Sequence, residues 1–319
     1  MSLGVADALV LLGRWLQETG YRFTTVTPAT HARINARSGA DKAHSLRDVF
    51  GWSRPFSAGL LPADALDWLR SAGLLECSGQ QLRSKVRFST LGSTLYAHSA
   101  YPTAQADAVF LGPDSHRFAA LVEAELQTQA LAAGARIVDI GCGAGPGGLA
   151  AALASATFRP HLLLADINPQ ALEFACANAL LAGLPDASFA QSDLFESLEG
   201  GFDLIVANPP YLVDAGERAY RHGGGALGSG LSVRIVAESL ARLVPGGRLV
   251  LYTGAPIVGG SDPFLEAVAP LVRRAGCLLR YREIDPDVFG DELDLPAYAS
   301  VERIAAVALV AACPPVTAP

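Results

Sequence analysis

The chain has 319 residues, of which 50% are hydrophobic and 17% are charged, and its formal net charge is −7. This length suits one large domain or two of ordinary size, and this composition excludes wholesale disorder. No apolar run reaches the roughly 18 residues of a membrane span, so we expect no membrane partner. The five cysteines form no C-x-x-C pair, which argues against a zinc cluster and fits a reducing compartment. We therefore predict a soluble cytoplasmic protein without a metal site.

Residues 1–105 are predicted to form a small α+β domain. Helical stretches are expected at 3–19 and 62–73, on either side of the polar segment 27–45. The sequence GLLECSGQQLRSKVRFSTLG then predicts two short strands around a Ser-Gly turn. A helix followed by a two-stranded ribbon is typical of a winged-helix-like module. We interpret this domain as the substrate-recognition part of the chain.

The charge of the chain is unevenly distributed. Residues 1–110 hold 11 Lys/Arg against 8 Asp/Glu, a net charge of +3, so the remainder carries −10. Arg83, Lys85 and Arg87 alternate along one predicted strand. Two interpretations stay open: a solvated strand face, or an attraction for a polyanion such as a nucleic acid.

From residue 136 onward the chain alternates short β-rich runs with helical stretches, which predicts a parallel sheet covered by helices. The expected strands are 136–140, 161–165, 187–191, 202–207 and 247–253, and the expected helices are 147–155, 169–183 and 230–243. The last two runs, 277–285 and 301–312, are joined by a loop too short for a crossover helix and should pair antiparallel. We therefore predict an α/β, Rossmann-like, seven-stranded, mostly parallel sheet with a reversed last strand, in a domain spanning residues 106–319.

A glycine-rich motif, VDIGCGAGPGG (138–148), follows the first of these strands and opens a helix. Glycines at 141, 143, 145 and 147 let the backbone turn tightly and approach a ligand without an intervening Cβ. A plain tight turn is one alternative. A dinucleotide site is another, because the motif also satisfies G-x-G-x-x-G.

Three acidic residues distinguish between these alternatives. Asp139 lies inside the glycine motif, while Asp166 and Asp193 follow the next two predicted strands. Each alone is as well explained as a helix cap or a loop residue. Together they would repel a pyrophosphate but suit a ligand with ammonium and sulfonium charges, with Asp166 on a ribose and Asp193 near an adenine amine. The set favours S-adenosylmethionine.

The stretch FDLIVANPPYLVD (202–214) ends a buried strand with an amide side chain, two prolines and an aromatic ring. The two prolines cannot continue a strand, and as an isolated feature the segment is a reasonable turn. The side-chain oxygen of Asn208 and the carbonyl of Pro209 can each accept one N–H of a planar NH₂ group. Pro209 and Pro210 together stiffen the loop, and Tyr211 offers a flat face for an amide or a base. The arrangement suits methylation of a weakly nucleophilic nitrogen.

Four segments together resemble class I S-adenosylmethionine-dependent methyltransferases: DIGCGAGPGGLAAALA, ADINPQALEFACANA, QSDLFESLEGGFDLIVANPPYL and PGGRLVLYTG. Within that class, SDLF followed by FDLIVANPPY is most similar to the HemK-type protein-glutamine methyltransferases of release factors. The resemblance covers residues 109–255 and leaves residues 1–105 unmatched. The chain departs from that family after Tyr211, where RAYRHGGGALGSGL replaces a Glu-Pro-containing segment.

The predicted site residues follow from these motifs. We predict as catalytic Asn208, Pro209, Pro210 and Tyr211. We predict as binding residues for the cofactor S-adenosyl-L-methionine Asp139, Gly141, Gly143, Gly145, Asp166, Ile167, Asp193, Leu194 and Asn208.

The loop IDPDVFGDELDLPAY, between the last two strands, is rich in acids. The topology would place it on the cofactor edge of the sheet, near the substrate entrance. It contains Asp285, Asp287, Asp291, Glu292 and Asp294. Two interpretations stay open: a solvated loop, or a surface that recognises a basic segment of a partner. The spacing of the acidic residues does not match a calcium-binding loop.

Three functions compete at this point. The first is N-methylation of a protein glutamine side chain, with a release factor or a ribosomal protein as partner. The second is methylation of an exocyclic amine of an RNA or DNA base, with nucleic acid bound through residues 1–105. The third is a binding module that keeps the cofactor fold without catalysis, and the intact tetrapeptide argues against it.

Overall fold

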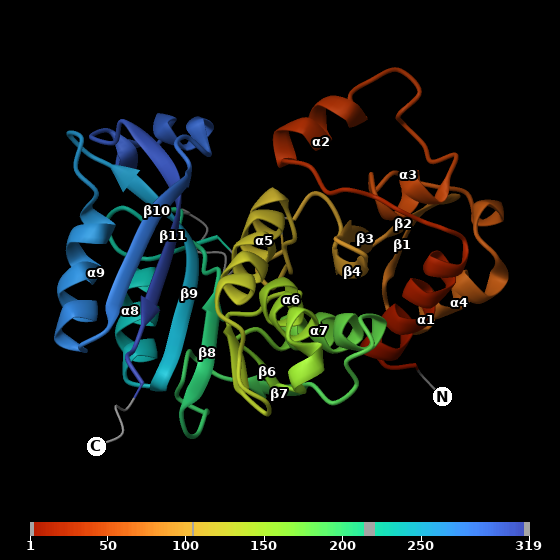
Figure 1. Ribbon diagram of the computed structural model, residues 1–319. Helices are drawn as coiled ribbons and strands as arrows, with labels where there is room; N and C mark the ends of the chain where they lie inside the picture. Colours follow the sequence, from red (N-terminus) through yellow and green to blue (C-terminus); the bar gives the residue numbers. More distant parts are fainter. Residues whose placement is uncertain (1–2, 104, 214–220, 316–319) are drawn as a thin grey trace. The chain divides into compact units, whose positions relative to one another are not determined.

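The computed structural model describes residues 3–103, 105–213 and 221–315 and divides into two compact units (Figure 1). The first unit comprises residues 1–116 together with the short segments 143–146 and 169–185. The second unit comprises the remaining residues and carries the large sheet. The segment 169–185 falls in the expected catalytic part of the sequence, yet it packs with the first unit. Among the described helices, none is long and apolar enough to cross a bilayer.

The first unit combines helices with two separate β-hairpins. Its helices are α1 (Val5–Glu18), α2 (Pro28–Asn35), α3 (Leu46–Phe50), the 3-10 helix η1 (Ala58–Leu60), α4 (Ala63–Ser71) and α7 (Pro169–Leu181). Its strands are β1 (Leu75–Ser78), β2 (Gln81–Ser84), β3 (Val86–Leu91) and β4 (Thr94–Ser99). The β1–β2 hairpin follows α4 and turns at Ser78-Gly79, as the sequence predicted. The second hairpin, β3–β4, was not predicted.

Local sequence explains two details of the first unit. The polar segment after residue 27 starts a helix because Thr27 Oγ1 accepts a hydrogen bond from the backbone N–H of Thr30 at 3.2 Å, and Pro28 fits the first turn. Helix α1 packs against α7, and at Gly13 any Cβ would lie 2.5 Å from Leu181 Cδ1. Glycine at this position therefore permits the close approach of the two helices.

The second unit contains a seven-stranded sheet in the order β10-β11-β9-β8-β5-β6-β7. The strands are β5 (Arg136–Ile140), β6 (His161–Asp166), β7 (Ser188–Gln191), β8 (Phe202–Ala207), β9 (Leu243–Ile257), β10 (Leu278–Asp285) and β11 (Arg303–Ala312). All neighbours are parallel except that β11 runs antiparallel to both β9 and β10. The predicted Rossmann-like sheet with a reversed last strand is confirmed.

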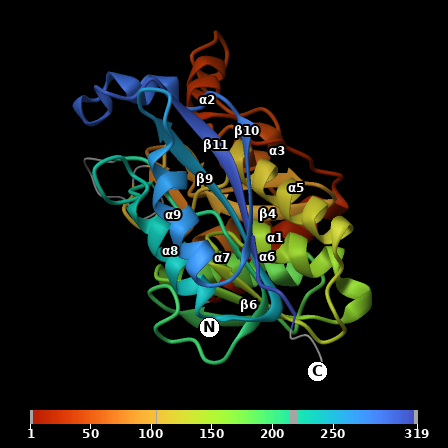
Figure 2. The same cartoon turned by 60° about the vertical axis from the view of Figure 1, so that its left-hand side comes forward.

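Helices cover this sheet and close its core. They are α5 (Pro113–Thr128), α6 (Pro146–Ala154), the 3-10 helix η2 (Ala156–Phe158), α8 (Gly230–Leu240), α9 (Pro263–Arg274) and the 3-10 helices η3 (Gly290–Asp294) and η4 (Pro296–Tyr298). Helices α8 and α9 lie side by side and pack against β9 (Figure 2). The central strands are apolar on both faces, with Val206, Leu251 and Leu309 fully buried. Such strands are typical of a parallel sheet covered on both sides.

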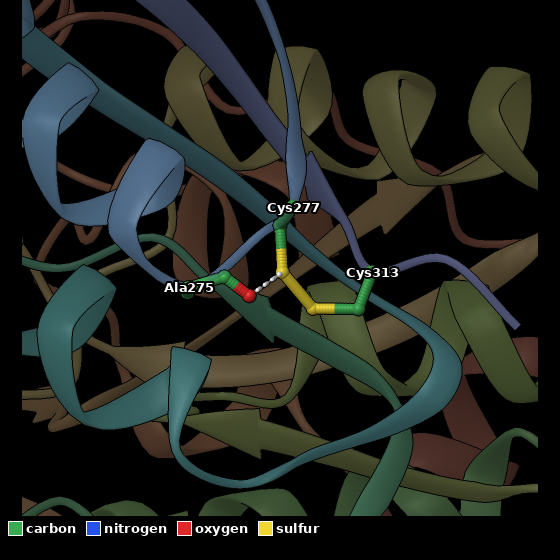
Figure 3. The surroundings of a disulfide bond; sticks show 3 residues. All are labelled: Ala275, Cys277 and Cys313. Carbon is green, nitrogen blue, oxygen red and sulfur yellow. Dashed lines mark hydrogen bonds between the residues drawn. A yellow bond between two sulfur atoms is a disulfide. The ribbon is translucent and has the colours of Figure 1, made fainter. Parts of the chain in front are cut away.

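A disulfide joins Cys277 and Cys313 at the ends of β10 and β11 (Figure 3). The register pairs Leu278 with Ala312, so the two cysteines, one residue further out on each strand, lie opposite one another with Cα atoms 4.2 Å apart. No disulfide was expected from the scattered cysteines, and this bond runs against the reducing compartment that they suggested. The sequence analysis did not pair these residues because they are 36 positions apart and only the antiparallel register brings them together.

The disulfide gives a first testable prediction. Denatured, unreduced protein should expose three thiols to an alkylating reagent, those of Cys77, Cys142 and Cys176, and reduction should raise the count to five. Because the bond closes a loop of 36 residues in the unfolded chain, its reduction should lower the free energy of unfolding by about 3–4 kcal/mol. Cys77→Ser, at an exposed free cysteine, is the matched control. Alkylation of all five thiols without a reductant would contradict the pairing.

Candidate active site

The carboxyl ends of three adjacent strands bring the predicted site residues of the second unit together. Strand β5 lies between β6 and β8, and its last residue, Ile140, pairs with Ala165 and with Ala207. The next residues on those two neighbours are Asp166 and Asn208, which therefore lie at the same edge of the sheet. The chain order of the strands reverses between β5 and β8. Ligands of open α/β sheets bind at such a reversal.

Asp139 is buried beneath the glycine motif. Its side chain is 1% exposed, and Oδ2 accepts a hydrogen bond from the backbone N–H of Gly148 at 2.7 Å, in the first turns of α6. Burial raises the pKa of Asp139 to about 7; the Gly148 bond opposes this rise and the nearby Asp166 charge adds to it. At Gly148 a Cβ would lie 2.9 Å from Asp139 Cβ, so only glycine allows this contact. The carboxyl group thus links β5 to α6.

The glycine motif itself uses backbone conformations that favour glycine. Gly141, Gly143 and Gly145 have φ angles of 67°, 53° and 84°. A Cβ built on Gly141 or on Gly143 would meet no atom within 4 Å, so the backbone at these two residues borders open space. The motif therefore leaves room for a ligand to approach the main chain.

Part of this motif is held by the first unit. The Nδ2 group of Asn178, on α7, donates to the carbonyl of Ala144 at 2.9 Å and to the carbonyl of Ala97 at 3.0 Å. Its Oδ1 accepts from the backbone N–H of Ala97 at 2.7 Å. Asn178 is fully buried, and its polar groups connect three segments of the first unit. The sequence analysis did not single out this residue.

Asp166 ends β6 at the predicted position. It is 9% exposed, and its Oδ1 accepts from the backbone N–H of Asn168 at 2.9 Å. Its carbonyl accepts from the backbone N–H of Ser192 at 3.0 Å, so the loops after β6 and β7 are linked. Ile167 follows with 56% of its surface exposed, which is unusual for a large apolar side chain. A carboxylate and an exposed apolar surface therefore lie next to one another at this edge.

The loop after β7 carries the other two predicted residues. Asp193 Oδ1 lies 3.6 Å from Arg234 Nη2 of α8, an ion pair that the sequence analysis missed. Leu194 is 8% exposed and has a φ angle of 48°, a conformation that leucine rarely adopts. Backbone outliers of this kind concentrate at functional sites.

The tetrapeptide follows β8 directly. Asn208 is half-buried and Pro209 is buried. Tyr211 is 6% exposed, and its ring packs so closely on β9 that a Cβ at Gly254 would lie 2.2 Å from its Cδ2 atom. Phe289 meets the same ring edge-on, with centroids 5.8 Å apart. The ring predicted to face a planar substrate is thus packed inside the protein in this structure.

Two further loops hold the backbone after the tetrapeptide. Leu212 donates to the carbonyl of Arg221 at 3.2 Å and accepts from the N–H of Gly223 at 2.9 Å. The backbone N–H of Val213 donates to the hydroxyl of Tyr298 at 2.8 Å. The tetrapeptide is therefore supported from several sides, as a preorganised loop requires.

The acidic loop between β10 and β11 lies over this region through Phe289 and Tyr298. Two of its five predicted acids are engaged within the protein: Asp285 pairs with Arg117 at 2.9 Å, and Glu292 pairs with Arg221. Part of the loop's charge therefore holds the loop in place. Within the described residues no cluster of His, Cys, Asp and Glu could hold a metal ion.

Three residues of this region escaped the sequence analysis. Gly254 carried a signal, because a glycine inside a strand often marks a close approach. Phe289 and Tyr298 carried none, since their contacts depend on the path of a long loop.

Residues 118–257 match the methyltransferase small domain family. The chain is 37% identical over 169 residues to a release factor glutamine methyltransferase of Deinococcus radiodurans, across 49% of this chain and 55% of that protein. It is 37% identical over 110 residues to ribosomal RNA small subunit methyltransferase C of Salmonella arizonae, across 33% of this chain and 31% of that protein. The chain thus spans about half, or less, of the length of these curated relatives.

The solved structures that match the chain are more distant in sequence. Trm5b from Pyrococcus abyssi gives a TM-score of 0.49 at 15% identity, covering 75% of this chain and 62% of that one. The T. thermophilus 16S rRNA methyltransferase RsmC, solved with AdoMet and guanosine, gives a TM-score of 0.44 at 18% identity, covering 82% of this chain and 64% of that one.

Proposed function

We propose that this chain N-methylates a planar nitrogen, because residues 118–257 match the methyltransferase small domain family, whose cofactor is S-adenosylmethionine. The observation that carries the proposal is the position of Asn208-Pro209-Pro210-Tyr211 at the carboxyl end of β8, beside β5. The leading acceptor is the side-chain amide of a protein glutamine. A release factor or a ribosomal protein, in the cytoplasm, is the proposed partner.

The residues at the sheet edge fit the cofactor. The carboxylate of Asp166 suits the ribose hydroxyls, and the exposed side chain of Ile167 suits a flat apolar ring. Asp193 and Leu194 would meet the adenine, while Asp139 balances the ammonium group from beneath. The backbone of the glycine motif leaves open space at Gly141 and Gly143, and Gly145 shares their positive φ angle. When bound, the cofactor supplies an electrophilic methyl group.

The tetrapeptide would act on the acceptor nitrogen. Its lone pair is delocalised, so it reacts only when the NH₂ group is held with that lone pair along one axis. Asn208 Oδ1 and the Pro209 carbonyl can accept the two N–H groups and so fix this orientation. Both acceptors also stabilise the positive charge that develops on nitrogen as the new N–C bond forms. The nitrogen then loses one proton to water, so no dedicated general base is needed.

A second candidate acceptor is an exocyclic amine of an RNA or DNA base. The net charge of +3 on residues 1–110 favours it, because a basic surface attracts a phosphate backbone. The acidic remainder of the chain opposes it. A non-catalytic binding module is the third candidate, and the well-supported tetrapeptide argues against it.

One labelling experiment separates these candidates. Cell extract is incubated with the purified chain and cofactor carrying a labelled methyl group, then divided between nuclease and protease treatment. We expect label that survives nuclease and that mass spectrometry places on glutamine. Label lost with nuclease would support the base amine instead. No label in either fraction, from protein that binds the cofactor, would leave only the binding module.

The raised pKa of Asp139 predicts a pH dependence. With its pKa near 7, Asp139 is neutral in about half of the unliganded molecules at neutral pH, whereas a ligand ammonium group favours the ionised form. Cofactor affinity should therefore increase severalfold, up to about tenfold, as the pH rises from about 6 to 8. The unliganded protein should respond in the opposite direction. Burial favours the neutral form of Asp139 in the folded protein. The contribution of Asp139 to the free energy of unfolding is therefore fully present below the pKa that it has in the unfolded chain, and it is lost as the pH rises through about 7.

Calorimetry across this pH range checks the first effect. Asp139→Asn, which stays neutral, is the control and should remove the part of the pH dependence that comes from this residue. An unchanged pH profile in Asp139→Asn would exclude the proposed linkage.

A further inference from the structure

Among the residues that the structure describes, one buried arginine of the first unit, Arg87, has no acidic partner. Arg87, on β3, is 3% exposed, and its Nε donates to the carbonyl of Ser99 at 3.2 Å. Its Nη1 lies 3.3 Å from Nδ1 of His31, a fully buried residue of α2. The other ring nitrogen of His31, Nε2, lies 2.9 Å from the carbonyl of Trp52. The imidazole is therefore neutral, with its proton on Nε2 and its Nδ1 accepting from Arg87.

Of this pair, the charged Arg87 is poorly suited to burial without an anion, whereas the neutral His31 is not. Burial, reinforced by the charge of Arg87, lowers the pKa of His31 to about 4, so His31 does not compete with Arg87 for a negative ligand at neutral pH. Burial also lowers the pKa of Arg87 to about 10. Desolvating an unpaired charge is costly, and most buried arginines are paired with carboxylates. Arg54 of the same unit shows the usual arrangement, with Asp48 at 2.6 Å.

Arg87 has more hydrogen-bond donors than partners among the described residues. A guanidinium has five N–H groups, and two of those of Arg87 have partners among the described residues. Its Nη2 makes no hydrogen bond there and is not one of the fully enclosed unpaired atoms, so the small exposed fraction of Arg87 includes this nitrogen. The two N–H groups of Nη2 are the donors that an oxyanion would use.

Aromatic rings surround the pair. Tyr101 stacks on His31 with ring centroids 4.0 Å apart, and Trp52 lies 5.2 Å from the same imidazole. Trp52 in turn meets Phe23 edge-on at 5.1 Å. Tyr101 and Trp52 are both half-buried, so part of each side chain is exposed to solvent.

Further positive charge lies close by in the sequence and is exposed. Arg33 follows His31 on α2, Arg37 comes just after that helix, and Lys85 precedes β3. In the described parts of the chain none of these three forms an ion pair, whereas Arg54 and Arg70 of the same unit do. Exposed cations without internal partners are available to a polyanion.

We propose that Arg87, His31, Tyr101 and Trp52, here called the Arg87 cluster, form a binding site for a phosphate group of single-stranded RNA. The unused N–H groups of Arg87 can donate to the oxygens of a phosphate, and the planar guanidinium suits the spacing of two phosphate oxygens. Partly exposed aromatic side chains near a cation are the usual surface on which nucleic-acid bases stack. An acidic peptide would not use these aromatic side chains. The site lies in the first unit and does not depend on which nitrogen is methylated.

The test measures RNA binding by the full chain without cofactor, so it is independent of methyl transfer. A labelled single-stranded RNA of about 12 nucleotides, a length in the range of known single-strand sites, is titrated at several salt concentrations and followed by fluorescence anisotropy. Arg87→Met should weaken binding about 10- to 100-fold, the scale of a lost hydrogen bond to a charged group. The slope of log affinity against log salt should fall by about 0.7, the share of one phosphate of a single strand.

The controls separate lost recognition from a lost fold. Arg14→Met removes an exposed arginine of α1 in the same unit and should change affinity less than threefold. Arg87→Lys keeps the charge but not the fork, so it should recover the salt slope and only part of the affinity. Circular dichroism and cofactor binding confirm that each variant is folded.

A measurement on the unaltered chain keeps the proposal testable if Arg87 variants do not fold. Ultraviolet crosslinking to the same RNA should join it to peptides containing Trp52 or Tyr101. The proposal is overturned if the wild-type chain does not bind RNA, if folded Arg87→Met binds it unchanged, or if crosslinks avoid those peptides. Binding of an acidic peptide without binding of RNA would likewise overturn it and assign the cluster to a protein partner.

Discussion

Asn208→Ala should slow methyl transfer by about 10²–10³-fold, as expected for loss of one preorganised contact to developing charge. The variant removes one of the two acceptors that we assign to the target NH₂ group. Asn208 is half-buried at the end of β8. The carboxyl group of Asp166 and the backbone of the glycine motif are unaltered by this change. Cofactor affinity should therefore remain close to that of the wild-type chain.

Single-turnover rates at saturating cofactor measure this effect directly. Asn208→Asp is the sharper comparison, because a carboxylate still accepts a hydrogen bond, and it should retain more activity than the alanine variant. A wild-type rate in Asn208→Ala would mean that the tetrapeptide is only a turn.

The catalytic fold was predictable because its signals are local. Strand runs such as RIVDI and FDLIVA are apolar and end at glycine, aspartate or asparagine, and these polar ends align once the strands are parallel. The sequence therefore indicated that Asp166 and Asn208 both follow the ends of sheet strands, without any knowledge of their contacts. The reversed last strand followed from a loop too short for a crossover helix.

What the sequence did not indicate depends on contacts between distant segments. Arg87 looked like part of an alternating basic strand with Arg83 and Lys85, yet the latter two are exposed and Arg87 is buried. Its strand, β3, pairs with β4 in a hairpin, and Arg87 contacts His31 of α2. The residue pattern within a six-residue strand does not reveal a contact with a distant helix. In the same way, Tyr211 carried an aromatic signal for substrate stacking, but its ring packs against Gly254.

The structure also changes how the tetrapeptide is understood. Its stiffness was attributed to two prolines, whereas the backbone after it is also held by Gly223 and Tyr298. Preorganisation at this site is then a property of three loops, and substitutions well outside the tetrapeptide should affect the reaction rate.

Gly223→Ala should lower the rate of methyl transfer by about 10²-fold, although this residue has no proposed contact with the substrate. A Cβ at this position would lie 1.8 Å from the carbonyl oxygen of Gly228 and 2.7 Å from that of Pro210. These are backbone atoms, which cannot rotate away as a side chain can, so the backbone must shift, and Pro210 of the tetrapeptide is one of the residues in its way. A displacement of about 1 Å in a positioned group can cost 10²-fold in rate.

Gly290→Ala is the matched control, because a Cβ there meets nothing within 4 Å and the residue lies in the same unit. It should keep the wild-type rate, and both variants should bind the cofactor normally. This pattern separates a displaced acceptor site from a general loss of structure, which would weaken cofactor binding as well. Equal rates in Gly223→Ala and Gly290→Ala would mean that the loop can shift without disturbing the reacting nitrogen, and that the support described for the tetrapeptide does not control catalysis.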